Sequence, residues 1–204
     1  MKTMNALLVA GLALAGSAAV AAADSTVATF ADPSNGSVSL FQFNAGTGTL
    51  TGGYTGSNLL LQTPGLPAIG DIAGAHFALT PLSAIGSFGN VYHLGAGQIN
   101  FTDSSNAPLL TISFGDAWLT GSLGLGASDF MSNSVSFSGP GMAGFSSVTN
   151  EAFSFSFANP VATAPTGSFT TTSSFTSSAN LIVPAPGAAA LLGLGGLVAG
   201  RRRR

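Results

Sequence analysis

The chain has 204 residues, of which 46% are hydrophobic, 28 are glycine and only 6% are charged, whereas about a quarter of an ordinary soluble domain is charged. This composition excludes a coiled coil, a nucleic-acid-binding protein and a charge-rich disordered chain, because each needs a high density of charge. The absence of cysteine excludes a disulfide framework and any thiolate metal site.

The charges are segregated along the sequence. The five cations are Lys2 and Arg201–Arg204, whereas the seven acids all lie between them. Residues 24–183 therefore carry seven acids and no Lys or Arg, a formal charge of −7 with histidine neutral. A body without side-chain cations cannot make charge-assisted contacts to phosphate. We expect neither nucleic acid nor an anionic lipid headgroup among its partners.

Residues 1–23 predict a secretory signal peptide. Lys2 precedes an apolar run from Ala6 to Val20, and a small-residue segment closes on Ala21 and Ala23 before Asp24. A short positive segment, an apolar stretch and an A-x-A site are typical of substrates of signal peptidase. The alternative, a membrane anchor, requires about 20 apolar residues, more than this run supplies. We expect cleavage after Ala23.

Residues 24–183 predict a body made of strands. Apolar and hydroxyl-bearing residues alternate most clearly at Leu110–Phe114, Val135–Ser138 and Phe153–Phe157, and this period of two is typical of a strand with one buried face. Further strands are expected at Ser37–Phe43, Thr47–Tyr54, Asn58–Thr63, Ile72–Thr80, Val91–Thr102 and Gly167–Thr176.

Turn-forming residues separate these segments, at 32–36, at 103–106 and at Asn133. Short strands without intervening helices predict an all-β fold, an antiparallel β-sandwich or jelly roll, with the 15 phenylalanines supplying much of the core. Residues 160–183, rich in Ser, Thr and Ala, are expected to form the last strand followed by a flexible stalk.

Side chains suited to catalysis or metal binding are few. A zinc site would need His76, His93 and carboxylates together, and we interpret both histidines instead as half-exposed strand residues. A secreted hydrolase is one hypothesis; it requires a cleft that holds Asp116, Glu151 or His93 with shifted pKa values. The leading expectation is that no residue is catalytic and that no metal or cofactor is bound.

Two loops contain oxygen ligands of the kind that calcium prefers. They are Asp32 with Asn35, and Asp103 with Asn106. Neither has the spacing of an EF-hand, so we favour turns stabilised by Asx side chains over a structural Ca²⁺ site.

Three aromatic residues are candidates for stacking on sugar rings, namely Trp118, Tyr54 and Tyr92. A carbohydrate-binding module would expose two or more of them on one face of a sheet. For Trp118 itself we expect burial, because a lone tryptophan in an apolar-patterned strand usually packs inside.

The C-terminal segment has three parts. Pro184-Ala185-Pro186 is followed by a Gly-, Ala- and Leu-rich run from Gly187 to Gly200 and then by Arg201, Arg202, Arg203 and Arg204. The prolines separate the last strand from this run, and the arginines predict a stop-transfer signal that stays cytoplasmic.

This tail, residues 184–204, resembles the PEP-CTERM sorting signal of Gram-negative bacteria, with Ala185 in place of the glutamate of the motif. The resemblance implies recognition by an exosortase at Pro184-Ala185-Pro186, transient insertion of an apolar transmembrane helix into the inner membrane, and stop-transfer at the arginines. It also implies export to the cell surface or extracellular matrix and an association with exopolysaccharide and biofilm.

The sequence thus favours an exported, non-catalytic protein of the surface or matrix. A carbohydrate-binding module and a secreted hydrolase are the alternatives.

Overall fold

The computed structural model describes residues 25–128 and 134–183. Several expectations fall outside these ranges: the signal cleavage at Ala21, Ala23 and Asp24, the turn at Asn133, and the whole tail with Pro184, Ala185, Pro186 and Arg201–Arg204. In the described ranges, no helix has the length and apolarity needed to cross a membrane.

The described body consists of strands joined by turns and by a short 3-10 helix, η2 (Pro140–Met142). Every strand pairing is antiparallel. The strands are β1 (Ser25–Phe30), β2 (Phe41–Asn44), β3 (Thr49–Tyr54), β4 (Leu60–Leu61), β5 (Ile72–Ala73), β6 (His76–Phe88), β7 (Val91–Leu94), β8 (Gly97–Thr102), β9 (Pro108–Phe114), β10 (Ala117–Thr120), β11 (Gly124–Ser128), β12 (Ser136–Ser138), β13 (Ser147–Thr163) and β14 (Ser168–Ile182). The all-β, antiparallel fold class is confirmed.

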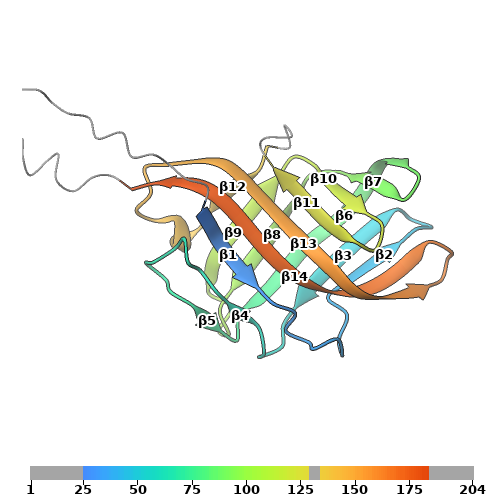
Figure 1. Cartoon of the computed structure of the whole chain (residues 1–204), viewed down its shortest axis with the longest axis horizontal. Coiled ribbons are helices and arrows are strands. Elements are labelled where there is room, and N and C mark those ends of the chain that lie inside the picture. Colours follow the sequence, from blue (N-terminus) through green and yellow to red (C-terminus); the bar gives the residue numbers. More distant parts are fainter. Residues whose placement is uncertain (1–24, 129–133, 184–204) are drawn as a thin grey trace, which may run out of the picture.

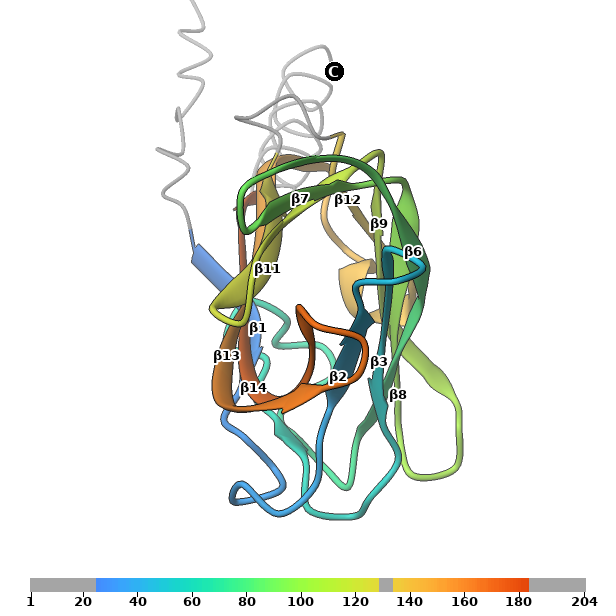
Figure 2. The same cartoon turned by 90° about the vertical axis from the view of Figure 1, so that its right-hand side faces the viewer.

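Eight strands close into a ring in the order β2-β3-β6-β7-β10-β11-β13-β14, which Figure 2 shows end-on. The long strand β6 allows this closure, because its first half pairs with β8 and its second half with β7. Strand β14 closes the ring on its other side, because the beginning of β14 pairs with β2. Further along, β14 pairs with β1. The two sheets of the expected sandwich are therefore joined along both edges.

Beyond the ring, the fold continues as two facing sheets (Figure 1). Strands β8, β9 and β12 extend one sheet from β6, and β1 extends the other from β14. Because Ser25 pairs with Ala179, β1 begins at the same end of the body at which β14 finishes.

Phenylalanine rings from both sheets fill the core. The Phe155 ring lies near the centre, with its centroid 4.8 Å from that of Phe41 and 4.9 Å from that of Phe175. Rings from six different strands meet in this cluster: Phe30, Phe41, Phe77, Phe101, Phe155 and Phe175. All six are at most 2% exposed, so the core that the phenylalanine content predicts is present.

The end of the body differs from the prediction. Strand continues to Ile182, paired with β13, where we expected a flexible stalk within residues 160–183. Several hydroxyl groups in this segment donate hydrogen bonds to neighbouring backbone carbonyls. Ser177 Oγ donates to the Ala28 carbonyl at 3.1 Å, and Thr171 Oγ1 donates to that of Ala158 at 2.6 Å. A Ser/Thr-rich composition is compatible with a buried strand when the hydroxyls find such partners.

Candidate functional site

Trp118 lies on the outer face of the ring. In β10, Ala117 and Leu119 are fully buried, whereas Trp118 and Thr120 point outward, and Trp118 is 39% exposed. The expectation that this tryptophan packs in the core is therefore wrong. Strand geometry explains the difference, because side chains alternate between faces and Trp118 shares its phase with Thr120.

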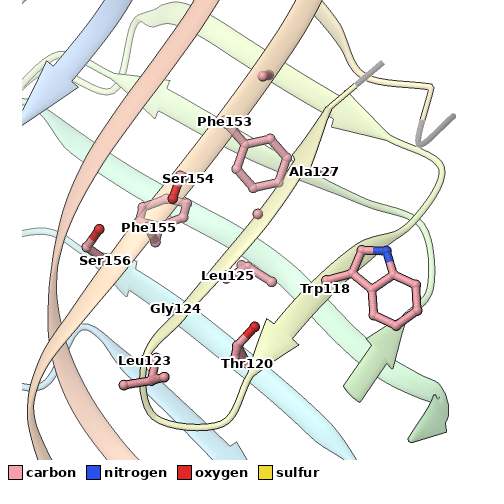
Figure 3. A pocket seen from close by; sticks show the side chains of 12 residues that line it. Trp118, Thr120, Leu123, Gly124, Leu125, Ala127, Phe153, Ser154, Phe155 and Ser156 are labelled. Carbon is pink, nitrogen blue, oxygen red and sulfur yellow. The ribbon is translucent and has the colours of Figure 1, made fainter. Parts of the chain in front are cut away.

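Next to Trp118, two glycines leave part of the outer face of β11 without side chains. Gly126 lies between Trp118 of β10 and Ser154 of β13, and Gly124 lies in the same way between Thr120 and Ser156. The result is an open groove of about 530 Å³ with Trp118 at one side and serine hydroxyls at the other (Figure 3). We call this feature the Trp118 groove; its outer lining is Trp118, Thr120, Leu123, Gly124, Gly126, Ala152, Ser154 and Ser156.

The close approach of β13 also disfavours larger residues at these two positions, more strongly at Gly124 than at Gly126. A Cβ at Gly124 would lie 2.5 Å from the carbonyl oxygen of Phe155, and one at Gly126 would lie 3.0 Å from that of Phe153. Larger residues would thus push β11 away from β13 as well as fill the groove.

A cross-strand neighbour stacks on Trp118. His93 of β7 pairs directly with Trp118, and their rings are nearly parallel, at 9°, with centroids 4.4 Å apart. The Nε2 atom of His93 lies 2.5 Å from the Oδ2 atom of Asp116, in the connection just before β10. Asp116 therefore fixes the imidazole, and the imidazole supports one face of the indole.

The structure does not bring the other two candidate aromatics to this face. Tyr92 precedes His93 on β7 and points to the inside of the ring, where it packs 4.5 Å from Phe43 between ring centroids. Tyr54 lies on β3, away from β10, and is partly buried against the core. Of the three candidates for sugar stacking, Trp118 is the one on the groove.

Of the three groups named for a hydrolase, the structure brings His93 and Asp116 together and separates Glu151 from them. Glu151 is buried between the sheets and accepts a hydrogen bond from the backbone N–H of Phe137 at 2.8 Å, whereas His93 and Asp116 lie on the outer face. His76 begins β6, and His93 faces Gly86 ten residues along that strand, a separation of about 30 Å at the usual strand rise. The two histidines share no site.

The two loops with candidate calcium ligands form Asx-stabilised turns. Asp103 accepts hydrogen bonds from the backbone and side chain of Ser105 and from the N–H of Ala107, at 2.7 to 2.8 Å. The Ser105 hydroxyl is the largest cause that lowers the pKa of Asp103, with the Ala107 N–H next.

Asp32 binds its own loop in the same way, through Ser34 and Gly36. Burial is the largest single influence and raises its pKa, but the hydrogen bonds from Ser34, Thr172 and Gly36 together outweigh it and lower the pKa. Within residues 25–128 and 134–183, no three His, Asp or Glu side chains are placed to hold a metal ion.

Comparison of the chain with protein-family models, curated proteins and solved structures finds no match. The resemblance of the tail to the PEP-CTERM signal therefore rests on its own residues. The function of the body has to be argued from its geometry.

Sequence reasoning overlooked the groove, although a signal for it was present. The segment Gly124-Leu125-Gly126-Ala127 alternates in the same way as Phe153-Ser154-Phe155-Ser156, with glycine in place of the outward side chains.

Proposed function

We propose that the chain is an exported, non-catalytic protein of the cell surface or extracellular matrix that associates with hydrated exopolysaccharide. Its terminal segments direct it there: the first is removed by signal peptidase, and the tail is processed by an exosortase after transient insertion in the inner membrane. The support for sorting is the three-part pattern of residues 184–204.

The observation that supports the body's role is the outer face of β10, β11 and β13. This face combines a half-exposed tryptophan with serine and threonine hydroxyls, and residues 24–183 contain no lysine or arginine. Hydroxyls both donate and accept hydrogen bonds, as the hydroxyls of a polysaccharide do. The same face supports the carbohydrate-binding hypothesis, so a matrix protein and a carbohydrate-binding module would use the same surface.

Fractionation of cells that produce the full chain together with an exosortase tests this proposal. We expect the protein in the surface and matrix fraction, and we expect digestion of the matrix polysaccharide to release it. A matched variant with Pro184→Ala and Pro186→Ala should instead accumulate in the inner membrane. If the unaltered protein stays in the inner membrane, or in the matrix fraction regardless of polysaccharide digestion, the proposal is wrong.

A further inference from the structure

The Trp118 groove has the dimensions and lining of a ligand site. Its volume of about 530 Å³ lies within the range of about 300–1,000 Å³ that is usual for small-molecule sites. From Trp118 across Gly126 to Ser154 the groove spans two strand spacings, which is about 10 Å. The groove thus has the indole of β10 on one side, the glycine backbone of β11 at its floor and the serine hydroxyls of β13 on the other side.

The lining selects among ligand classes. It contains no cation, so a phosphate or carboxylate group would find no charged partner. A peptide strand could not extend the sheet here, because β11 is already paired with β10 on one side and β13 on the other. A neutral sugar matches the remaining features, since it offers an apolar C–H face to an aromatic ring and hydroxyl groups to serines.

The His93–Asp116 pair explains how Trp118 is held ready for such a ligand. An exposed indole normally samples several rotamers, and ordering one on binding reduces affinity. The parallel imidazole, itself fixed by Asp116, restricts the indole before binding. The stacked imidazole occupies one face of the indole and leaves the second for a ligand.

We propose that the Trp118 groove binds a neutral polysaccharide segment, with one sugar ring against the indole and the next over Gly126, hydrogen-bonded to Ser154 and Ser156. His93 and Asp116 act as positioning residues that hold the indole. This inference rests on the proposed association with exopolysaccharide and identifies the surface and the chemical class of polymer that it requires.

Trp118 is the only tryptophan in the chain, so its fluorescence reports on the groove directly. The full-length protein is titrated with soluble mixed-linkage β-glucan, galactomannan and dextran, and with alginate as a charged comparison. We expect at least one neutral polymer to shift the tryptophan emission and to retard the protein in affinity electrophoresis. We expect alginate to do neither.

Variants separate a groove from a general surface effect. Ser154→Tyr places a ring in the groove, whereas Ser136→Tyr adds the same ring to an exposed position of β12 in the other sheet. We expect Trp118→Ala and Ser154→Tyr to weaken binding about tenfold or more, the scale of losing an aromatic anchor. Ser136→Tyr should bind as the unaltered protein does.

The positioning role has its own readout. His93→Ala should change the emission of the unliganded protein, because the stacked imidazole is lost, and should weaken binding less than Trp118→Ala. His93→Phe keeps a flat ring but loses the contact with Asp116, so its affinity should lie between that of His93→Ala and that of the unaltered protein. Unchanged emission in His93→Ala would contradict the positioning role.

Failure of this inference is distinct from failure of the proposed function. The groove proposal is overturned if no neutral polymer binds, or if Ser154→Tyr and Ser136→Tyr bind equally well. In either case the protein can still be recovered from the matrix with its tail processed, and the proposed function then stands on a different surface.

Discussion

Replacing Phe155 with alanine tests the packing of the core most severely. The side chain is fully buried, and five phenylalanine rings have their centroids within 4.8 to 6.2 Å of its own. Truncation of a buried phenylalanine typically costs about 3–5 kcal/mol. Because rings from both sheets surround this site, the cavity has little scope to collapse, and we expect a loss near the upper end, about 4–5 kcal/mol.

Such a loss is a large part of the total stability of a domain, which is about 5–15 kcal/mol. Urea denaturation measures it as a lower midpoint at unchanged m-value. The matched control is Phe88→Ala, because Phe88 is 89% exposed at the end of β6, and a surface substitution of this kind should stay within about 0.5 kcal/mol. Equal losses in the two variants, or a loss below about 1 kcal/mol for Phe155→Ala, would refute this account of the core.

Three further predictions follow from the site and the tail. Trp118→Ala should lower the free energy of unfolding by about 1 kcal/mol, since the indole is half-exposed; a loss of about 3–5 kcal/mol in urea would show that it is a core residue. The pKa of Asp32 is lowered in the folded protein, so the stability that its carboxylate contributes is present above the ordinary pKa of 3.8 and disappears as the pH falls below it. The difference in the free energy of unfolding between Asp32→Asn and the unaltered protein, less than about 1 kcal/mol near the surface, should therefore shrink from pH 6 to pH 2. A difference that grows over this range would contradict the prediction. Replacing Arg201–Arg204 with serine removes a restraint of about 2.5–3.5 kcal/mol for each charge that would have to cross the membrane. The variant should therefore reach the periplasm with its tail uncleaved, and normal processing in a mass spectrum would count against the stop-transfer role.

The strands that the sequence predicts correctly are those in which local pattern and tertiary environment agree. Leu110–Phe114 lies within β9 with its apolar side chains buried, and Phe153–Phe157 lies within β13 with Phe153 and Phe155 buried and Phe157 partly buried. Two of the expected strands, Ile72–Thr80 and Val91–Thr102, are each divided into two strands in the structure. Gly74, with φ of 70°, separates β5 from β6, and residues 95–96 separate β7 from β8.

Other elements have no local signal. β11 is rich in glycine, which has low strand propensity, and pairing with β10 and β13 on either side determines its conformation. Closure of the ring depends on pairings between segments that are not adjacent in sequence, such as Phe43 with Phe169 and His93 with Trp118. A pattern read over a few residues contains no information on these registers.

The sequence is sufficient to predict the orientation of Trp118 but not the contacts that hold it. Alternation in Ala117-Trp118-Leu119-Thr120 is sufficient to place Trp118 outward, because Trp118 shares its phase with the polar Thr120. The general tendency of tryptophan to be buried points the other way. The stacking on His93 was not predictable, because it needs the register of β7 against β10. The contact of His93 with Asp116 follows from the same register.

The intact mass of the protein recovered from the cell surface tests the central claim most directly. The account predicts an N-terminus at Asp24 and a C-terminus near Pro184-Ala185-Pro186, in a protein that is not retained in the inner membrane. A surface protein that still ends in Arg201–Arg204 would be a simple anchored protein, and sorting through the tail would be contradicted.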